Sequence, residues 1–299
     1  MPSPTPRSKC CAWGEGATTT APIAAILREI VLTQPLLIDH NDGVDTVTLN
    51  RPDALNALDP AMIDALNVYF SGLYRNRDTR VVVLKGAGKN FCAGLDLKNA
   101  MARRAGQQEM PGVTESLDSQ RRIADIVMAM RKCPQPIIAL VQGAAAGGGF
   151  ALALAADIRI ATTSARMNCA FIKLGLGGCD IGSSYFLTRL VGVSVASELI
   201  LTGRFIHADR ALTVGLVSEV VAEDELDSAA APYIDAMMSA SPVGLRLSKE
   251  CLNMAVDAGS IEQVIAMEDR NQVLCSRSEE FNEGIRAFME KRKPVYVKR

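Results

Sequence analysis

From Leu36 onward, the apolar residues of this chain repeat with two different spacings, one of two residues and one of about 3.6 residues. The first spacing is typical of strands and the second of helices, so their alternation predicts an α/β fold in which strands are followed by helices. The strands expected on this basis are 44–49, 80–85, 135–141 and 158–161, and the helices expected between them are 59–77, 116–131 and 148–155.

Beyond Gly182 the pattern becomes mainly helical. The helices expected there are 182–191, 194–202, 208–214, 224–239, 243–256, 261–276 and 278–291. The last three have wide apolar faces, which predicts that this part of the chain docks on a partner subunit. We therefore divide the chain into a lead-in over 1–35, a core over 36–223 and a helical C-terminal region over 224–299.

Two stretches lack any apolar period. Residues 1–35 are rich in Pro, Ser, Thr and Gly, which predicts a disordered lead-in, and they have neither a hydrophobic signal core nor the arginine-rich pattern of a transit peptide. Residues 100–113 include Gly106, Pro111 and Gly112, and we expect a mobile loop there, beside the ligand.

The composition argues against two classes of partner. The chain has 299 residues, of which 48% are hydrophobic, and its 32 Lys and Arg nearly balance its 33 Asp and Glu. This balance leaves no basic surplus of the kind that nucleic-acid binding needs. No apolar run reaches the roughly 18 residues that a membrane span requires. We therefore expect neither a nucleic acid nor a membrane as a partner.

The eight cysteines are scattered, without the paired spacing of a zinc site or of a secreted disulfide framework. This distribution favours a reducing compartment, and we expect a cytoplasmic protein. With only two histidines, His40 and His207, neither a metal site nor a histidine-based catalytic triad is expected. His207 stands directly before a predicted helix and fits a turn or capping residue better than a base.

The most informative segment is 142–157, with the sequence QGAAAGGGFALALAAD. Its triple glycine, 147–149, lies between an apolar strand candidate and an alanine-rich helix. The N–H groups at the start of a helix have no partner within the helix, and glycine has no Cβ to keep an oxygen away. Such a helix start can polarise a carbonyl oxygen, so the segment predicts an oxyanion hole.

A second segment, 89–98 with the sequence KNFCAGLDLK, follows an apolar run that predicts an inner strand. Ala93 and Gly94 predict a turn at the strand end, and we expect the N–H of Leu95 to point at the same oxygen as the N–H of Gly148. The glycines do not predict a dinucleotide site, because their spacing is not G-x-G-x-x-G and no acidic residue stands about 20 positions on.

Five segments, taken in order, carry a family resemblance: VDTVTLNRPDALNALD, VVVLKGAGKNFCAGLDL, PIIALVQGAAAGGGFALALAADIRIA, FLTRLVG and ASELILTGR. From about residue 36 to the C-terminus, the chain resembles the enoyl-CoA hydratase/isomerase family, also called the crotonase superfamily. The resemblance implies a crotonase-like spiral of βαβ units with an α-helical C-terminal trimerisation region. It further implies a homotrimer or a dimer of trimers.

The resemblance also implies the ligand. A CoA thioester is the expected substrate, with its carbonyl oxygen held by the N–H groups of Leu95 and Gly148, and no cofactor or metal is expected beyond the CoA that the substrate carries. In the family, the residues that match Leu95, Asp96, Leu97 and Lys98 lie against the CoA adenine. We therefore expect these four residues to bind the substrate.

Two positions depart from the family pattern. Hydratases of the family have one glutamate two residues after the triple glycine and a second about 20 residues on, and the matching residues here are Ala151 and Phe171. Neither side chain can transfer a proton, so the usual two-glutamate hydration has no agents here. We expect Phe171 to contact the substrate instead.

One carboxylate, Asp180, stands where dienoyl-CoA isomerases and 4-chlorobenzoyl-CoA dehalogenases of the family have an aspartate. In the isomerases it transfers protons and in the dehalogenases it attacks the ring. An aspartate just before a helix is also a good N-cap, so two interpretations of Asp180 stay open, catalysis and capping. Asp157 is expected to order the turn into the next strand, and Asp96 to fix its loop or to line the CoA site.

Two functions remain in competition. The first is an enzyme that uses the oxyanion hole with Asp180 as its retained catalytic carboxylate, for which isomerisation or another enolate step ranks above hydration, and hydration above C–C or C–halogen chemistry. The second is a catalytically silent acyl-CoA-binding paralogue, which the same two substitutions, Ala151 and Phe171, would explain. The sequence leaves the identity of the acyl chain open.

Overall fold

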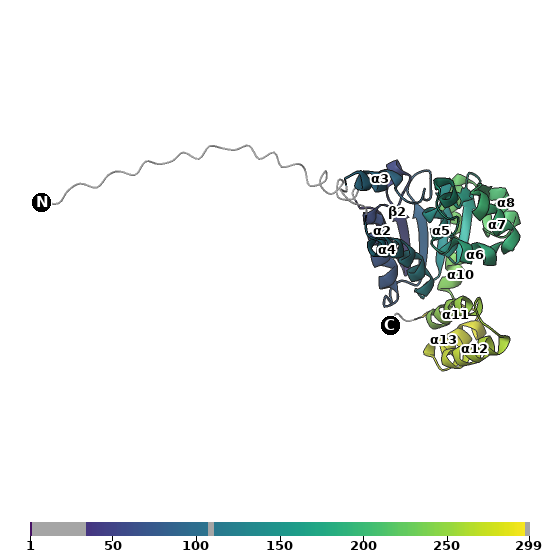
Figure 1. The fold of residues 1–299 in the computed structure, drawn as a ribbon. Helices are drawn as coiled ribbons and strands as arrows, with labels where there is room; N and C mark the ends of the chain where they lie inside the picture. Colours follow the sequence, from purple (N-terminus) through teal and green to yellow (C-terminus); the bar gives the residue numbers. More distant parts are fainter. Residues whose placement is uncertain (2–33, 107–110, 297–299) are drawn as a thin grey trace. The chain divides into compact units, whose positions relative to one another are not determined.

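The computed structural model describes residues 1, 34–106 and 111–296, and Figure 1 follows them along the chain. The four expected strands pair into a main sheet together with two strands that were not expected, β1 and β9, in the order β1-β2-β3-β4-β6-β9. β1 runs antiparallel to β2, and every later pair in this sheet is parallel. The strands of the main sheet are β1 (Leu36–Asn41), β2 (Val44–Leu49), β3 (Val81–Gly86), β4 (Ile137–Val141), β6 (Ile158–Thr162) and β9 (Glu219–Val221).

A second, smaller sheet has the order β5-β7-β8, with β5 parallel to β7 and β7 antiparallel to β8. Its strands are β5 (Ala144–Ala146), β7 (Arg166–Asn168) and β8 (Ile206–His207). We did not expect these strands from the sequence, because strands of two or three residues are too short to show a period of two. The sheet matters for the site, because β5 leads directly into the triple glycine.

The helices follow the strands, as the alternating pattern predicts. They are α2 (Pro60–Leu73), α3 (Leu97–Ala105), α4 (Val113–Lys132), α5 (Gly148–Ala155), α6 (Ser183–Leu190), α7 (Gly192–Thr202), α8 (Ala208–Thr213), α9 (Leu226–Ala229), α10 (Ala231–Met238), α11 (Pro242–Ala255), α12 (Ile261–Ser276) and α13 (Glu279–Met289). Short 3-10 helices are η1 (Pro52–Ala54), η2 (Ala170–Leu174) and η3 (Glu223–Glu225). The α/β fold class expected from the sequence is confirmed.

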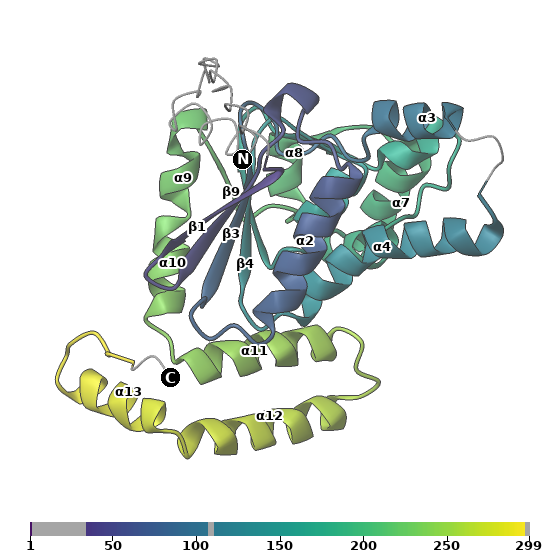
Figure 2. The same cartoon turned by 90° about the vertical axis from the view of Figure 1, so that its left-hand side faces the viewer.

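Both faces of the main sheet are covered by helices, which explains why β4 and the first four residues of β3 are all apolar. Val82 and Leu84 of β3 belong to the larger core cluster, which includes side chains of α2, α4 and α5. Val81 and Val83 point to the other face, where they join a second cluster with side chains of α9 and α10. Figure 2 shows α2 and α4 on one side of the strands and α9 and α10 on the other.

The loop predicted over 100–113 is wrong at both ends, which are helical. Helix α3 occupies Leu97–Ala105, and α4 already begins at Val113, while residues 107–110 lie outside the described part of the chain. The prediction relied on the missing apolar period, but α3 needs none, because few of its side chains are buried. Asp96 stabilises its start by accepting a hydrogen bond from the N–H of Asn99 at 3.0 Å.

Two other boundaries differ from expectation. The helix expected over 224–239 is divided into η3, α9 and α10, and Pro232, near the start of α10, lacks the N–H that a continuous helix would use there. Helix α2 ends at Leu73 rather than near Arg77. The side-chain oxygen of Asn76 accepts hydrogen bonds from the N–H groups of Asp78 and Thr79 instead, which forms a turn.

Residues Pro35–Arg299 form one compact unit, so the expected division near residue 223 stays a prediction, and the expected lead-in falls almost wholly on residues outside the described part. Within this unit, α11, α12 and α13 pack against one another beyond one end of the sheet (Figure 2). The buried Lys249 of α11 attaches them to the core: its Nζ lies 2.7 Å from the carbonyl oxygen of Gln135 and 2.8 Å from Oδ2 of Asp157.

Candidate active site

The two segments expected to supply N–H donors run side by side. Cys92 pairs with Ala145 of β5 in a parallel bridge, in which the N–H of Cys92 donates to the carbonyl of Ala144 and the N–H of Ala146 donates to the carbonyl of Cys92. Leu95 and Gly148 each stand three residues beyond this bridge in their segments. The pairing of residue 92 with residue 145 therefore places the two segments side by side, and the convergence of their N–H groups on one oxygen stays a prediction.

The approach of these segments is too close for side chains at two positions. Gly94 has φ of +89°, and a Cβ there would lie 2.5 Å from the carbonyl oxygen of Ala146 and 3.2 Å from the nitrogen of Gly148. A Cβ on Gly149 would lie 2.1 Å from the carbonyl oxygen of Cys92. Glycine is required at both positions, because any other residue would force the segments apart.

Among the described residues, no backbone acceptor in the loops and caps takes the N–H of Leu95 or of Gly148. Leu58 pairs with Leu95 in a second bridge, but the hydrogen bonds of that bridge run from the N–H of Leu58 to Gly94 and from the N–H of Asp96 to Leu58. The role of Leu95 and Gly148 as the two donors stays a prediction.

Apolar side chains surround the start of α5. A Cβ on Gly148 would meet Cδ1 of Leu58 at 3.0 Å and Cδ1 of Ile181 at 3.5 Å. The ring of Phe171, in η2, approaches Gly147 in the same way, at 3.4 Å. Phe171 is therefore next to the triple glycine, as expected, whereas Ala151 is fully buried inside α5. Neither residue brings a proton-transferring group to this site.

Asp180 lies in the loop before α6, next to Ile181, whose Cδ1 would lie 3.5 Å from a Cβ on Gly148. Its Oδ1 accepts a hydrogen bond from the N–H of Ile181 at 2.8 Å and another from Nε2 of Gln120, in α4, at 2.6 Å. The N-cap position of α6 is occupied by Gly182, and no side-chain hydrogen bond caps that helix among the described residues. The capping interpretation of Asp180 is therefore not supported.

The surroundings of Asp180 also affect its titration. Burial raises the pKa of the carboxyl group above its usual value, and the hydrogen bonds from Ile181 and Gln120 oppose that shift. A carboxyl group with a raised pKa holds a proton more readily at neutral pH than a fully solvated one. This property suits a group that accepts and returns a proton, although it does not by itself assign that role.

The remaining residues of the predicted CoA site follow Leu95 directly. Asp96 is the N-cap of α3, and Leu97 and Lys98 are its first residues, with both side chains exposed. Oδ2 of Asp96 also accepts a hydrogen bond from Nη2 of Arg51 at 2.9 Å. Asp96 therefore fixes its loop, one of the two roles expected for it. The predicted contact of this stretch with CoA remains untested.

Two other candidates for chemistry take structural roles. Asp157 accepts a hydrogen bond from the N–H of Ile137 at 2.8 Å, so it orders the turn before β6, as expected. Cys92 is fully buried between the two glycine segments, and burial raises the pKa of its thiol to about 12. A thiol of that pKa stays neutral at physiological pH, which excludes Cys92 as a thiolate nucleophile.

The described residues contain no cluster of three or more His, Cys, Asp or Glu that could hold a metal ion, and none of their helices is long and apolar enough to cross a membrane. Nδ1 of His40 lies 2.6 Å from Oδ1 of the buried Asp45, far from the triple glycine in sequence and on the edge strand β1. His207 stands at the N-cap position of α8, consistent with the turn role expected for it.

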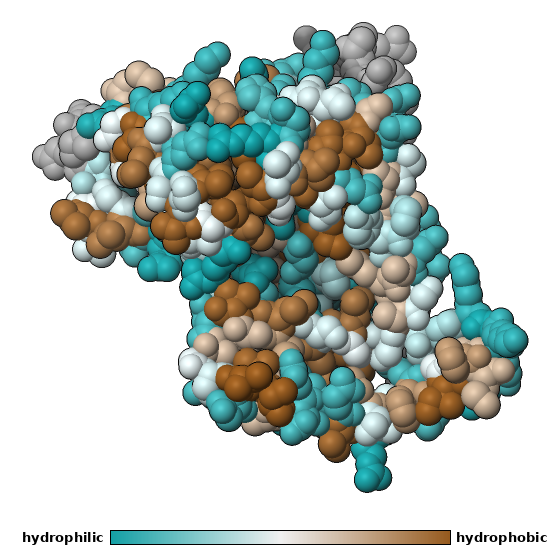
Figure 3. Space-filling model, turned by 90° about the vertical axis from the view of Figure 1, so that its right-hand side faces the viewer, coloured by the Kyte–Doolittle hydropathy of each residue, from teal (hydrophilic) through white to brown (hydrophobic). Residues whose placement is uncertain are grey.

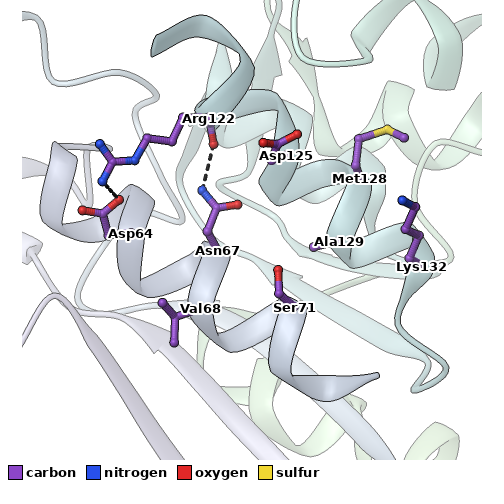
Figure 4. Close-up of a pocket in the computed structure, with 9 residues that line it drawn as sticks. All are labelled: Asp64, Asn67, Val68, Ser71, Arg122, Asp125, Met128, Ala129 and Lys132. Atoms are coloured by element: carbon purple, nitrogen blue, oxygen red, sulfur yellow. Dashed lines mark hydrogen bonds and ion pairs between the residues drawn. The ribbon is translucent and has the colours of Figure 1, made fainter. Parts of the chain in front are cut away.

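A polar groove between α2 and α4 forms a separate feature (Figure 4). Arg122 pairs with Asp64 across it, and Nδ2 of Asn67 donates to the carbonyl oxygen of Arg122 at 2.8 Å. None of the predicted site residues lines this groove. We therefore place the candidate site at the triple glycine, next to the apolar side chains of Leu58, Ile181 and Phe171.

Two site residues escaped the sequence analysis. Arg51 lies within the segment VDTVTLNRPDALNALD, which carried part of the family resemblance, so a signal for it was present. Gln120 gave no such signal, because a glutamine on an exposed face of a helix is common and its partner Asp180 is 60 residues away. Only the packing of α4 beside the loop before α6 brings the two together.

Comparison with known proteins identifies the family. The family model described as enoyl-CoA hydratase/isomerase matches residues 39–299. A Mycobacterium tuberculosis protein named "Probable enoyl-CoA hydratase EchA12" is 35% identical over 264 residues, which cover 88% of this chain and 92% of that protein. The 1,2-epoxyphenylacetyl-CoA isomerase of Escherichia coli is 34% identical over 255 residues, covering 85% of this chain and 95% of the isomerase.

Solved structures agree with this result. The crystal structure of an enoyl-CoA hydratase from Bacillus anthracis superposes with a TM-score of 0.82 at 34% sequence identity, and the match covers 89% of this chain and all of that one. The similarity therefore extends over both the sheet and the C-terminal helices rather than over the glycine motif alone. On these grounds the chain belongs to the enoyl-CoA hydratase/isomerase family, that is, to the crotonase superfamily.

Proposed function

We propose that this chain is an enzyme that acts on an acyl-CoA or enoyl-CoA thioester and moves a double bond or forms another enolate. In this proposal the thioester oxygen accepts hydrogen bonds from the N–H groups of Leu95 and Gly148, and Asp180 transfers the proton. The observation that carries the proposal is the parallel pairing of residues 92 and 145, which brings these two peptide segments level beside the loop of Asp180.

The chemistry follows from the charge that develops on the oxygen. When a base removes a proton from the α-carbon of a 3-enoyl thioester, the electron pair spreads onto the carbonyl oxygen as an enolate. Two fixed N–H donors stabilise that negative charge, and the loss of one such donor costs roughly 2.7–4 kcal/mol of barrier in a comparable enzyme. The same carboxylate then returns the proton to the γ-carbon, so the double bond becomes conjugated with the thioester.

A single carboxylate is sufficient for this proton shift, whereas hydration must also orient a water molecule. This difference favours isomerisation here, because the residues at the two glutamate positions of hydratases are Ala151, which is fully buried, and Phe171, which is 8% exposed. The name of one relative, 1,2-epoxyphenylacetyl-CoA isomerase, is compatible with isomerase chemistry on this scaffold. Hydration ranks second in the proposal.

A catalytically silent acyl-CoA-binding protein is the second candidate. The observation in its favour is the same pair of residues, since Ala151 and Phe171 leave no carboxylate at either of the two glutamate positions of hydratases. In either case the proposal includes CoA as part of the ligand, no further cofactor, a cytoplasmic location, and assembly as a homotrimer or a dimer of trimers.

The reaction class can be tested with a panel of 2-enoyl-, 3-enoyl- and aryl-substituted acyl-CoA thioesters. Isomerisation of a 3-enoyl-CoA increases the absorbance of the conjugated thioester without a change in mass, whereas hydration of a 2-enoyl-CoA removes that absorbance and adds the mass of one water. We expect the first result. Saturable binding without turnover of any member of the panel would support the silent paralogue instead.

The predicted donor can be removed with little effect on the fold, because Gly148 is the first residue of α5 and proline is tolerated at the first position of a helix. We expect Gly148→Pro to lower kcat by roughly 100- to 1000-fold. Gly148→Ala is the matched control, since it keeps the N–H and adds a methyl group against the flexible Leu58 side chain. Full activity of Gly148→Pro in steady-state assays would contradict the oxyanion assignment.

A further inference from the structure

One arginine, Arg51, holds the peptide segment that carries Leu95. Its Nη2 donates to Oδ2 of Asp96 at 2.9 Å, its Nη1 donates to the carbonyl oxygen of Ala57 at 2.6 Å, and its Nε lies 3.3 Å from Oδ2 of Asp59. The side chains of all three charged residues are less than one-quarter exposed. The guanidinium group is therefore fixed by partly buried contacts on three sides.

Both carboxylates that Arg51 binds are themselves helix N-caps. Oδ1 of Asp59 accepts a hydrogen bond from the N–H of Met62 at 2.8 Å, at the start of α2, and Oδ1 of Asp96 accepts one from the N–H of Asn99 at 3.0 Å, at the start of α3. One side chain therefore links the starts of two helices. The loop that ends at Asp96 is anchored to α2 through this link.

The backbone between these contacts sets the direction of the Leu95 N–H. The N–H of Leu58 donates to the carbonyl oxygen of Gly94 at 2.7 Å, and the N–H of Asp96 donates to the carbonyl oxygen of Leu58 at 3.0 Å. Successive peptide groups of an extended segment point to opposite sides, so the N–H of Leu95 points away from Leu58. Gly94, which precedes Leu95, packs against Gly148. A movement of Asp96 would therefore rotate the peptide group that carries the Leu95 N–H.

The charge of Asp96 matters as well as its position. The N–H of Asn99, together with Arg51, holds the pKa of this carboxyl group below its usual range, so the group is ionised at neutral pH. A negative charge one residue from the predicted oxyanion donor opposes the formation of a second negative charge on the thioester oxygen. Arg51 forms an ion pair with the same carboxylate, and its positive charge offsets that repulsion.

We infer that Arg51 is a positioning residue for the oxyanion hole: through Asp96 it fixes the direction of the Leu95 N–H, and it neutralises the carboxylate next to that donor. This inference rests on the proposed function, because it requires the thioester oxygen to bind at Leu95. Arg51 itself does not touch the reacting atoms. Its loss therefore weakens the polarisation of a bound thioester more than it weakens binding.

Vibrational spectroscopy measures this polarisation directly. An unreactive conjugated thioester such as cinnamoyl-CoA, labelled with ¹³C at the carbonyl, is bound to the full chain, and the C=O stretching frequency is compared with that of the free ligand. We expect the wild-type protein to lower the frequency and Arg51→Met to lose at least half of that shift at saturating ligand. On the substrate that the panel identifies, kcat should fall by up to about 100-fold with a much smaller change in KM.

Arg122→Met is the matched control, because it breaks another arginine–aspartate pair that includes a residue of α2 but does not touch the loop of Leu95. Its carbonyl shift should equal that of the wild type. If Arg51→Met does not fold, Arg51→Lys replaces it and should also reduce the shift. A full shift in the Arg51 variants, with or without lower thermal stability, would overturn the inference. A wild-type protein that binds the thioester without any shift would instead contradict the proposed function.

Discussion

At the level of single residues, Asp180 is the candidate whose environment says most about its chemistry. Its carboxyl group accepts hydrogen bonds in the loop whose next residue, Ile181, lies near Gly148, and burial raises its pKa. Two donors oppose this shift, the backbone N–H of Ile181 and the side-chain amide of Gln120. A proton carrier needs this balance, because a carboxylate that is too strongly stabilised would not take up a proton from carbon.

This balance predicts the pH dependence of the reaction. Asp180 must be ionised to accept the first proton, so kcat/KM should fall as the pH falls through its raised pKa. Gln120→Leu removes a donor that stabilises the carboxylate, and the acid limb of the profile should therefore move to higher pH.

The role of Asp180 itself is tested by its own variant. Asp180→Asn should abolish turnover while CoA binding, measured by calorimetry, stays near that of the wild type.

The exposed neighbour Ser119 provides the control, since Ser119→Leu changes the same turn of α4 and should leave the profile unchanged. If Gln120→Leu also leaves the acid limb in place, Gln120 does not tune Asp180. Normal turnover by Asp180→Asn would show that Asp180 is not the proton carrier.

At the level of elements, a buried lysine contributes to the attachment of the C-terminal helices to the core. Lys249 of α11 is 4% exposed, and its Nζ donates to the carbonyl oxygens of Gln135 and Met130 at 2.7 and 3.2 Å. It also pairs with Asp157, which orders the turn before β6. The contact therefore connects α11 to the same α4–β4–β6 framework that positions the start of α5.

Replacement of Lys249 with methionine keeps most of the side-chain volume and removes every hydrogen-bond donor. Asp157 and the carbonyl oxygen of Gln135 would then be left with fewer partners, and we expect the free energy of unfolding to fall by about 1–3 kcal/mol. Denaturant titration followed by circular dichroism measures this change. Glu250→Gln, on the exposed face of the same helix, should leave the free energy of unfolding within about 0.5 kcal/mol of the wild type. Equal free energies of unfolding for the two variants would exclude a role of Lys249 in attaching α11.

At the level of the whole unit, α11 to α13 expose several large apolar side chains, as a docking surface does. They include Leu252, Ile261, Val273, Leu274, Ile285, Phe288 and Met289. Figure 3 shows apolar patches both on the upper body and on the lower, helical part, with a hollow between them. This surface is consistent with the subunit contact that the sequence predicts, although the number of subunits remains a prediction.

Light scattering coupled to size-exclusion chromatography tests that prediction. We expect the mass of a trimer or of a dimer of trimers, and we expect Phe288→Asp, at a side chain that is 82% exposed, to shift the mass towards that of the monomer. Val68→Asp changes a side chain of similar exposure, 75%, in the groove between α2 and α4, and should leave the assembly intact. A wild-type chain that is monomeric at micromolar concentration would contradict the expectation.

Features that depend on residues close together in the chain could be predicted before any coordinates. The strand over Val44–Leu49 and the helices over Gly148–Ala155 and Ile261–Ser276 were predicted with the boundaries that the structure has, because their apolar periods and their capping or glycine residues are local. The same is true of the glycine motif and of the family to which it points. The loop expected over 100–113 was wrong because a polar helix shows no apolar period.

Features that depend on distant pairs needed the three-dimensional arrangement. The bridge between residues 92 and 145, the clamp of Arg51 on Asp96, and the contact of Gln120 with Asp180 each join segments 45 to 60 residues apart. No local pattern encodes such a pair, because the side chains meet only after the sheet has aligned the loops at its edge. The glycine motif alone was therefore enough to predict that backbone N–H groups stabilise an oxyanion. Only the folded chain decides which N–H groups lie side by side and which carboxylate lies near them.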